Sequence, residues 1–266
     1  MRGCGRFYLL TLVMLAAPSL HAQSPSELVQ VVPPQVRMQP PPANASAEEL
    51  EKRGDDLRSE KAYLDALDYY RAALAKTPTA RVYNKAGIAG LQLRRDRDSQ
   101  RDFERAVKLD RDFADAWNNL GVSYYVDRKY SKAIKQYQKA IKLKQDVASF
   151  YANLGAAYYS QKEWEKAATA YGQALQLDPD LFERGSRNGV AAQLPSPQDR
   201  SHFNYLVAKL YAKQGDRDRA LEYLRRAMEE GYKAINDVYK DPEFAALRTD
   251  TRFTQLMAAR PPAIPE

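Results

Sequence analysis

Histidine and cysteine, the side chains that most often serve as general bases, nucleophiles and metal ligands, are almost absent from this chain. Its 266 residues include two His and one Cys. The sequence contains no HExxH, CxxC, GxxxxGK or GxSxG motif, which are the signatures of zinc proteases, thiol redox sites, phosphate loops and nucleophile elbows. His202 could act as a general base, but no Ser or Cys partner is evident for it. We therefore expect no catalytic residue, no metal and no cofactor.

Carboxylates are the one catalytic resource that the composition leaves open. The chain has 34 Asp and Glu, and a pair of them can hydrolyse a glycosidic bond. The least regular stretch is 182–200, which contains two Gly and two Pro and shows no helical pattern. Irregular segments of this length are often functional, although many are plain surface loops. An enzyme of this kind would need a cleft of converging carboxylates near 182–200.

The positive net charge of +7 does not indicate a nucleic-acid partner. The most highly charged stretch, 94–112, contains seven Lys or Arg but also six Asp or Glu. Charges of alternating sign are typical of a solvated helix face, whereas phosphate binding requires a basic stripe. A modestly basic surface could still favour lipid head groups or acidic polysaccharide.

The first 22 residues have the parts of a secretory signal peptide. Arg2 and Arg6 precede an apolar run at 7–17, and Ala22 offers a small residue at the cleavage site. Eleven residues are too few to cross a bilayer, which takes about 20. We expect an exported protein, periplasmic or secreted, with an uncleaved anchor as the alternative and no transmembrane segment after cleavage. Cleavage would remove both arginines and lower the net charge from +7 to +5.

A proline-rich segment, 23–46, follows the predicted signal and has no aromatic residue. Such a composition favours an extended spacer. From Ala47 onward the chain instead repeats itself with a period of 34 residues. The stretch WNNLGVSYY at 117–125 matches YANLGAAYY at 151–159, and 132–143 matches 166–177 at the same spacing. Repeats of this length are typical of solenoids.

The repeated residues resemble the tetratricopeptide repeat family. One repeat carries Trp117, Leu120, Gly121, Tyr124, Ala133, Tyr137 and Ala140, and the next carries Tyr151, Leu154, Gly155, Tyr158, Ala167, Tyr171, Ala174 and Pro179. The resemblance covers about 47–234 without the insertion. It implies an all-α, right-handed solenoid of about five helix-turn-helix repeats. Apolar residues at helical spacing on successive helices lead to the same architecture.

This resemblance divides the chain into segments. We expect a signal peptide at 1–22, a linker at 23–46, repeats one to four at 47–181, an irregular insertion at 182–200, repeat five at 201–234, C-terminal capping helices at 235–258 and a tail at 259–266. Within the cap, Asp241-Pro242-Glu243 has the features of a helix start, and Asp250 is placed to begin a second short helix. Capping elements protect the end of a solenoid.

In proteins of this family the first helix of each repeat lines a concave groove in which peptides commonly dock. Transferred by position, the resemblance implies a binding groove lined by Asn84, Lys85, Ile88, Asn118, Asn119, Val122, Ser149, Asn153, Tyr159, Tyr205 and Lys209. Asn side chains suit an extended backbone because they donate and accept hydrogen bonds; Asn119 and Asn153 could equally be plain consensus residues. The basic set with which some members hold a C-terminal carboxylate is not present, since Glu51, Asp55, Ser149 and Asn153 stand at its positions.

These features predict a non-catalytic scaffold or adaptor of the bacterial cell envelope that binds a peptide or helix of a protein partner in the groove. The alternative is an accessory subunit of polysaccharide or peptidoglycan machinery that contacts glycan through Tyr159 and Tyr205. An enzyme with its site at 182–200 is a third possibility. Exposed tyrosine rings in the groove would favour the glycan alternative.

Overall fold

The structure, a computed structural model, describes residues 40–182 and 197–260. They all belong to one compact unit, Arg37–Glu266. Within these two ranges the regular secondary structure is entirely helical, which confirms the predicted fold class. No helix in them is both long enough and apolar enough to cross a bilayer. The predicted signal peptide and most of the predicted linker, insertion and tail lie outside the described residues.

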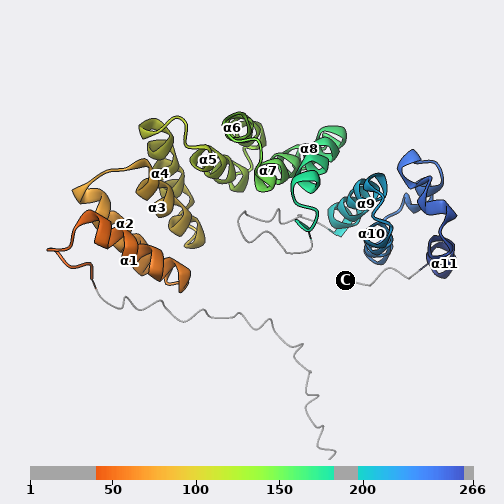
Figure 1. Ribbon diagram of the computed structural model, residues 1–266, viewed down its shortest axis with the longest axis horizontal. Helices are drawn as coiled ribbons and strands as arrows, with labels where there is room; N and C mark the ends of the chain where they lie inside the picture. The colour runs from red at the N-terminus through yellow and green to blue at the C-terminus, as the bar shows by residue number, and fades with distance from the viewer. Residues whose placement is uncertain (1–39, 183–196, 261–266) are drawn as a thin grey trace, which may run out of the picture. The chain divides into compact units, whose positions relative to one another are not determined.

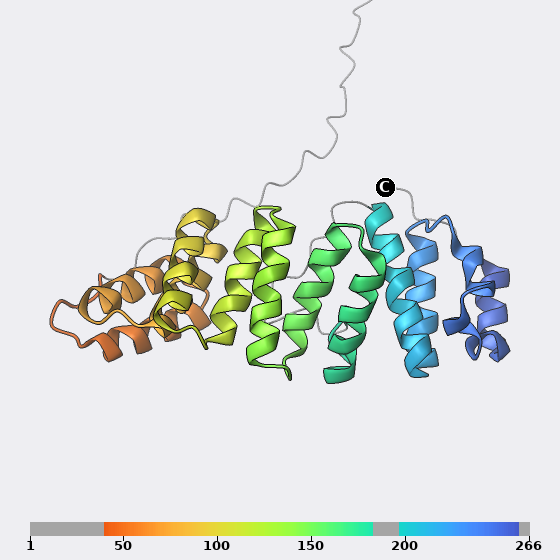
Figure 2. The ribbon, with the colours of Figure 1, turned by 90° about the horizontal axis from the view of Figure 1, so that it is seen from above.

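The helices form consecutive hairpins, each of which packs on the next along the chain (Figures 1 and 2). Their bounds in order are α1 Ala47–Ser59, α2 Tyr63–Lys76, α3 Ala80–Gln92, α4 Asp96–Leu109, α5 Ala114–Val126, α6 Tyr130–Leu143, α7 Ala148–Ser160, α8 Trp164–Leu177, α9 Pro197–Gln214 and α10 Arg217–Glu229. Three 3₁₀ turns follow, η1 Ile235–Tyr239, η2 Pro242–Phe244 and η3 Leu247–Thr249, and then α11 Thr251–Ala259. The four hairpins α1–α2 to α7–α8 fall within the range predicted for repeats one to four.

Local sequence signals set where several of these helices begin and end. Ser46 and Glu49 form a capping box at the start of α1, and each side chain bonds the backbone N–H of the other residue at 2.7 and 3.2 Å. Thr79 caps α3 through a bond from the Val82 N–H. Pro78 and Pro179 lie just beyond the ends of α2 and α8, because proline disfavours helix in the residue before it.

The turn inside each hairpin is closed by one residue in the left-handed conformation. In the first four hairpins this residue is basic and exposed, with a φ between 57° and 63°: Lys61, Arg94, Arg128 and Lys162. In the fifth it is Gly215, with a φ of 85°. A side chain with a Cβ is disfavoured in this region by roughly 1–2 kcal/mol, whereas glycine is not. The four basic residues adopt this conformation because the packing of the two helices requires the turn.

A glycine packs against an aromatic ring at the centre of each of the first four hairpins. The pairs are Gly54 with Tyr70, Gly87 with Phe103, Gly121 with Tyr137 and Gly155 with Tyr171. A Cβ added at any of these glycines would lie only 2.5–2.6 Å from the ring. All four rings are at most 2% exposed. The absence of a Cβ at each glycine therefore lets the ring approach the backbone of the facing helix closely.

Two boundaries differ from those predicted. The irregular insertion was predicted to reach residue 200, but α9 already begins at Pro197, and proline is well tolerated in a first helical turn. Asp241-Pro242-Glu243 starts only the three-residue turn η2, and the Asp241 side chain makes no cap hydrogen bond there. Asp250 does cap α11, as predicted, by accepting from the Arg252 N–H at 3.0 Å.

Candidate binding cleft

Most asparagines of the predicted groove are buried and bonded to one another. Asn84, Asn118 and Asn153 are each less than 8% exposed. The Asn119 amide donates to the Asn84 carbonyl oxygen at 2.9 Å, and the Asn153 amide donates to that of Asn118 at 2.9 Å. These bonds link α3 to α5 and α5 to α7. The side chains thus connect first helices of successive hairpins, and their polar atoms face neighbouring repeats.

The other predicted groove residues of the first four hairpins are also engaged or partly covered. The Lys85 ammonium lies 2.6 Å from Glu51 and 2.5 Å from Asp55, so α1 and α3 are joined by an ion-pair network. Val122 is 4% exposed and belongs to the core, and Ser149 is partly buried. The predicted set therefore does not form one continuous polar surface.

Tyr159 and Tyr205 do not present exposed rings. Tyr159 is 3% exposed, and its hydroxyl donates to the Asp199 carbonyl at 2.6 Å. Tyr205 is 4% exposed, and its hydroxyl donates to the Asp241 carboxylate at 2.8 Å. Stacking on a sugar requires an accessible aromatic face, which these two side chains do not offer.

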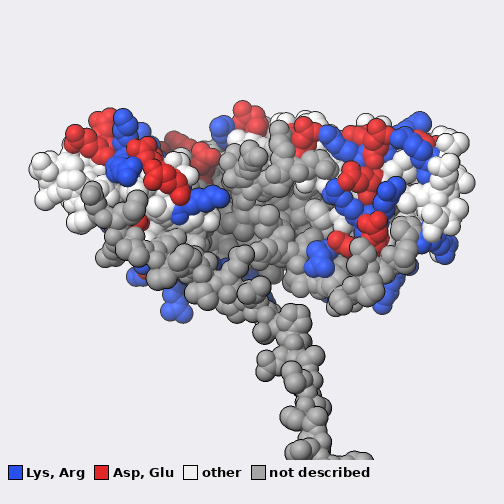
Figure 3. Space-filling model, turned by 90° about the horizontal axis from the view of Figure 1, so that it is seen from below, with Lys and Arg blue, Asp and Glu red and all other residues white. Residues whose placement is uncertain are grey.

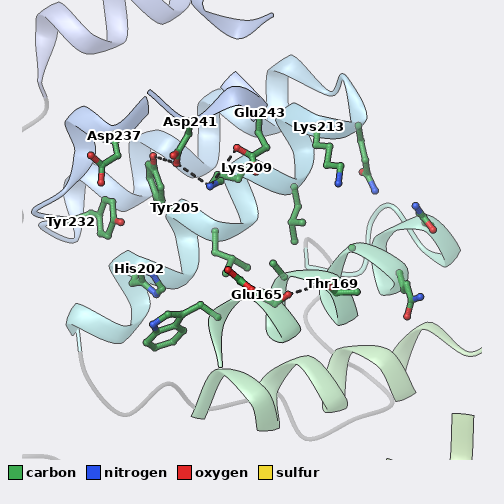
Figure 4. Close-up of a pocket in the computed structure, with 18 residues that line it drawn as sticks. Glu165, Thr169, His202, Tyr205, Lys209, Lys213, Tyr232, Asp237, Asp241 and Glu243 are labelled. Carbon is green, nitrogen blue, oxygen red and sulfur yellow. Dashed lines mark hydrogen bonds and ion pairs between the residues drawn. The ribbon is translucent and has the colours of Figure 1, made fainter. Parts of the chain in front are cut away.

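A cleft of about 910 Å³ opens where α8 and α9 face the segment that follows α10 (Figure 4). Its lining includes two of the predicted groove residues, Tyr205 and Lys209. The lining residues are Trp164, Glu165, Ala168, Thr169, Gly172, Gln173 and Gln176 of α8; His202, Tyr205, Leu206, Lys209, Leu210, Lys213 and Gln214 of α9; and Tyr232, Asp237, Asp241 and Glu243 beyond α10.

An ion-pair cluster forms one wall of the cleft. The Lys209 ammonium lies 3.0 Å from the Asp241 carboxylate and 3.4 Å from that of Glu243. Asp241 also accepts the Tyr205 hydroxyl bond, so α9 is tied to η2 by two of its side chains (Figure 4). Removal of a proton from Tyr205 would leave two negative groups in contact, and burial together with Asp241 raises the pKa of this tyrosine far above its ordinary value.

Aromatic side chains form the other end of the cleft. The His202 ring lies between Trp164, at a centroid distance of 4.5 Å, and Tyr232, at 5.8 Å. Tyr232 in turn stacks on Tyr205 at 4.4 Å. Burial among these rings is the main reason that the pKa of His202 is lowered from 6.5. His202 is therefore mainly neutral at neutral pH.

The bonds of Tyr159 fix the tautomer of this histidine. The Tyr159 hydroxyl gives its one proton to the Asp199 carbonyl, and its oxygen lies 2.9 Å from His202 Nδ1. Nδ1 must then donate to that oxygen, which leaves Nε2 as a hydrogen-bond acceptor on a ring that lines the cleft.

The family models match the repeats themselves. One, described as TPR repeat, matches residues 129–162, and two described as tetratricopeptide repeat match 148–181 and 205–239. The match at 148–181 covers the hairpin α7–α8, and the match at 205–239 covers most of α9 together with α10 and η1. The match at 129–162 spans α6 and α7, the adjoining helices of two successive hairpins. The chain belongs to the tetratricopeptide repeat family.

Solved structures give the same fold at low sequence identity. A structure described as the crystal structure of MamA protein is 22% identical, with a TM-score of 0.50, and the match covers 74% of this chain and 95% of that one. One from the functional characterization of Pseudomonas aeruginosa pilF is 20% identical, with a TM-score of 0.51, and covers 77% and 82%. No curated protein matches the chain. These likenesses establish a tetratricopeptide-repeat solenoid and nothing finer.

The cleft does bring carboxylates together beside α9, the helix that follows the predicted insertion. Asp241 and Glu243, however, converge on the ammonium of Lys209, so they are partners in an ion-pair cluster. The described residues contain no group of His, Cys, Asp or Glu arranged to hold a metal ion. Proteins of this family are generally non-catalytic scaffolds, and this arrangement is suited to binding.

The sequence alone did not reveal the wall of the cleft that is formed by residues after α10. The sequence did contain a signal for one face of α9, since His202, Tyr205, Lys209 and Lys213 follow one another at spacings of three and four residues. That signal could have marked the face. It could not have supplied Asp241, which lies more than 30 residues away and reaches α9 only through the fold of the segment after α10.

Proposed function

We propose that this tetratricopeptide-repeat protein is an interaction scaffold that binds a segment of a partner protein in the cleft between α8, α9 and the residues after α10. The observation that carries the proposal is the open cleft of about 910 Å³, which is within the size range of ligand sites. Leu206, Leu210 and Ala168 supply apolar lining, and Lys213, Gln173 and Gln176 supply polar groups. Such a mixed lining suits a peptide with apolar and polar side chains.

The position of this site differs from the groove predicted along the first four hairpins. There the amides of Asn84, Asn118 and Asn153 already bond within the stack, so they have less capacity for a ligand. Tyr205 and Lys209 are the predicted groove residues that line the cleft. The proposal thus keeps groove binding as the mechanism and moves its centre to the C-terminal side.

We further propose that the protein acts in the bacterial cell envelope after export. This part of the proposal is supported by the composition of residues 1–22 and by the proline-rich stretch that follows them. Direct glycan contact is less well supported, because Tyr159 and Tyr205 are buried. A protein partner is therefore the leading proposal.

Photo-crosslinking of the full chain in its native envelope tests the proposal. A photoreactive residue replaces Gln173, which is exposed and lines the cleft, and the matched control places it at Arg225, which is exposed on α10 outside the cleft. The variant that blocks the cleft is Gly172→Trp. A Cβ at Gly172 meets only Leu210, at 3.7 Å, so a large side chain there can extend into the cleft.

We expect one discrete protein to crosslink from position 173, not from 225, and to be lost in the Gly172→Trp variant. Crosslinks that persist in that variant would place the partner elsewhere and contradict the proposal. Recovery of glycan without protein would favour the alternative function.

A further inference from the structure

The lining of the cleft has the opposite net charge to the chain. Four of its side chains are acidic, namely Glu165, Asp237, Asp241 and Glu243, and only Lys209 and Lys213 are basic. With His202 neutral, the cleft has a net charge of −2, whereas the whole chain has +7. Figure 3 shows Lys and Arg side chains close to Asp and Glu side chains on the described part of one face.

The ammonium of Lys209 does not neutralise the acidic wall of the cleft, which is formed by Asp241 and Glu243. Lys209 is shared between two carboxylates, 3.0 Å from Asp241 and 3.4 Å from Glu243. Among the described residues, the buried Oε2 atom of Glu243 has no hydrogen-bond partner and only this ionic contact with Lys209. Two carboxylates share one ammonium, so this wall keeps a net negative charge, and the Asp241 and Glu243 side chains remain 25% and 28% exposed to an incoming cation.

The other nearby basic side chains, Arg248 and Lys240, do not neutralise this acidic wall. Arg248 donates to the backbone carbonyls of Val238 and Asp241 at 2.8 and 3.0 Å. Lys240 lies 3.8 Å from Asp237 and is 82% exposed, so solvent screens that pair. Neither side chain lines the cleft.

We infer that the occupant of the cleft is a positively charged amphipathic peptide segment, whose Lys or Arg side chains face Asp241 and Glu243 and whose apolar side chains contact Leu206 and Leu210. This inference rests on the proposed function. A Lys or Arg side chain brings donors and no acceptor, which is what the acidic wall lacks. The partly exposed rings of Trp164 and Tyr232 are further favourable neighbours for a cation.

A peptide that docks through its carboxylate is disfavoured by the same contacts. Lys209 is already engaged by two acids, so an incoming carboxylate would have to displace them or lie beside them. Like charges at such short range are repulsive. An acidic segment is therefore the outcome that the inference excludes.

The test uses three synthetic peptides of about 12 residues that share one leucine pattern and differ only in having Lys, Gln or Glu at the remaining positions. The chain has two tryptophans, so a Trp117→Phe background leaves Trp164, which lines the cleft, as the fluorescent probe of binding. We expect the Lys peptide to shift Trp164 emission and to bind about tenfold or more tightly than the Gln peptide. We expect no shift with the Glu peptide.

A charge-matched pair of variants locates the effect. Asp241→Asn with Glu243→Gln should weaken binding of the Lys peptide about tenfold and leave the Gln peptide unchanged. Asp218→Asn with Glu222→Gln removes the same charge from α10 outside the cleft and should change neither. If the cleft variant folds poorly, the salt dependence of Lys-peptide binding to the Trp117→Phe chain shows whether ion pairs carry the preference, since ion pairs weaken with added salt.

Each result has a defined consequence. Equal binding of the Lys and Gln peptides would overturn the cationic preference and leave the proposed function intact. Tighter binding of the Glu peptide than of the Lys peptide would also overturn the inference. So would an equal loss of Lys-peptide affinity in the cleft variant and in the α10 variant. No emission shift with any peptide would count against both the inference and the proposed function.

Discussion

The first four hairpins and the region from α9 onward solve the same packing problem in different ways. In α1–α8 every hairpin pairs a glycine with an aromatic ring 16 residues later, as with Gly121 and Tyr137. In α9–α10 the corresponding residues are Ala208 and Leu224, both 0% exposed. A leucine occupies less space than a flat ring, so a Cβ fits opposite it. The pairs change together because each fills one volume between two helices.

The two regions also differ in what their polar side chains do. Along the first four hairpins, buried amides such as Asn118 and Asn153 bond to each other between repeats. Beyond α8, two polar side chains of α9, Tyr205 and Lys209, bond instead to Asp241 in an irregular segment. In the regular stack, polar side chains therefore bond to equivalent side chains of the neighbouring repeats. The cleft arises where side chains of a repeat instead face a segment that does not follow the repeat pattern.

The largest expected effect is in the regular stack. Phe103→Ala should lower the free energy of unfolding by about 3–5 kcal/mol, because the ring is 0% exposed and its loss leaves a cavity against Gly87. Urea unfolding followed by circular dichroism measures the change. The control is Leu177→Ala, since Leu177 is 44% exposed and contributes little to the core. Similar losses for both variants would contradict the assigned register.

The hydrogen bonds between repeats should have the next effect. Asn118→Ala removes the acceptor of the Asn153 amide, which is buried, and an unsatisfied buried donor costs about 1–3 kcal/mol. The comparison variant is Asn204→Ala in α9, whose amide bonds to Glu230 of the same hairpin at 3.0 Å. Hydrogen exchange should increase in both α5 and α7 for Asn118→Ala but only within α9–α10 for Asn204→Ala. Uniform protection in the first variant would show that the bond does not join the repeats.

Two glycine-to-alanine substitutions in neighbouring helices should change the stability of the protein in opposite directions. At Gly155 the new Cβ would lie 2.6 Å from the Tyr171 ring, and we expect a loss of about 1–3 kcal/mol through overpacking. At Gly172, which lines the cleft, the Cβ meets only Leu210 at 3.7 Å, so better helix propensity should raise stability by about 0.5–1 kcal/mol. Thermal unfolding midpoints measure both. A destabilised Gly172→Ala variant would mean that the cleft is less open than described.

The smallest expected effect is a pH dependence confined to the cleft region. Burial lowers the pKa of His202 below 6.5, so the unfolded chain takes up its proton first as the pH falls through 6.5. Stability contributed by neutral His202 is thus present above pH 6.5 and is lost on acidification. The facing groups oppose each other, since Asp199 raises this pKa and Lys209 lowers it.

The measurement for His202 is the unfolding midpoint of the α9–α11 region at about pH 7.5 and about pH 5.5. Hydrogen exchange resolves this region from the first four hairpins, which contain no histidine in their described helices. His202→Phe should remove the difference between the two pH values. Asp250, whose pKa is lowered to about 2 by Arg252, does not titrate in this interval. Equal pH sensitivity in the His202→Phe variant would refute the assignment.

The sequence by itself determined the repeat fold, because that information is local and periodic. Gly, Ala and aromatic residues recur at 34-residue spacing, so each hairpin and its neighbour could be placed from spacing alone. The same reasoning reached Tyr205 and Lys209 by counting along α9. It placed Asn84 and Asn153 in an open groove, although the structure buries both.

Only the tertiary structure decided which polar groups face a ligand and which face another repeat. Spacing gives the face of a helix, but whether that face is covered depends on how far each hairpin turns from the last. The position of Asp241 and Glu243 against Lys209 depends on the fold of a non-repeating segment, for which no periodic signal exists. The cleft therefore follows from long-range packing, whereas the solenoid that carries it follows from residues that recur along the chain.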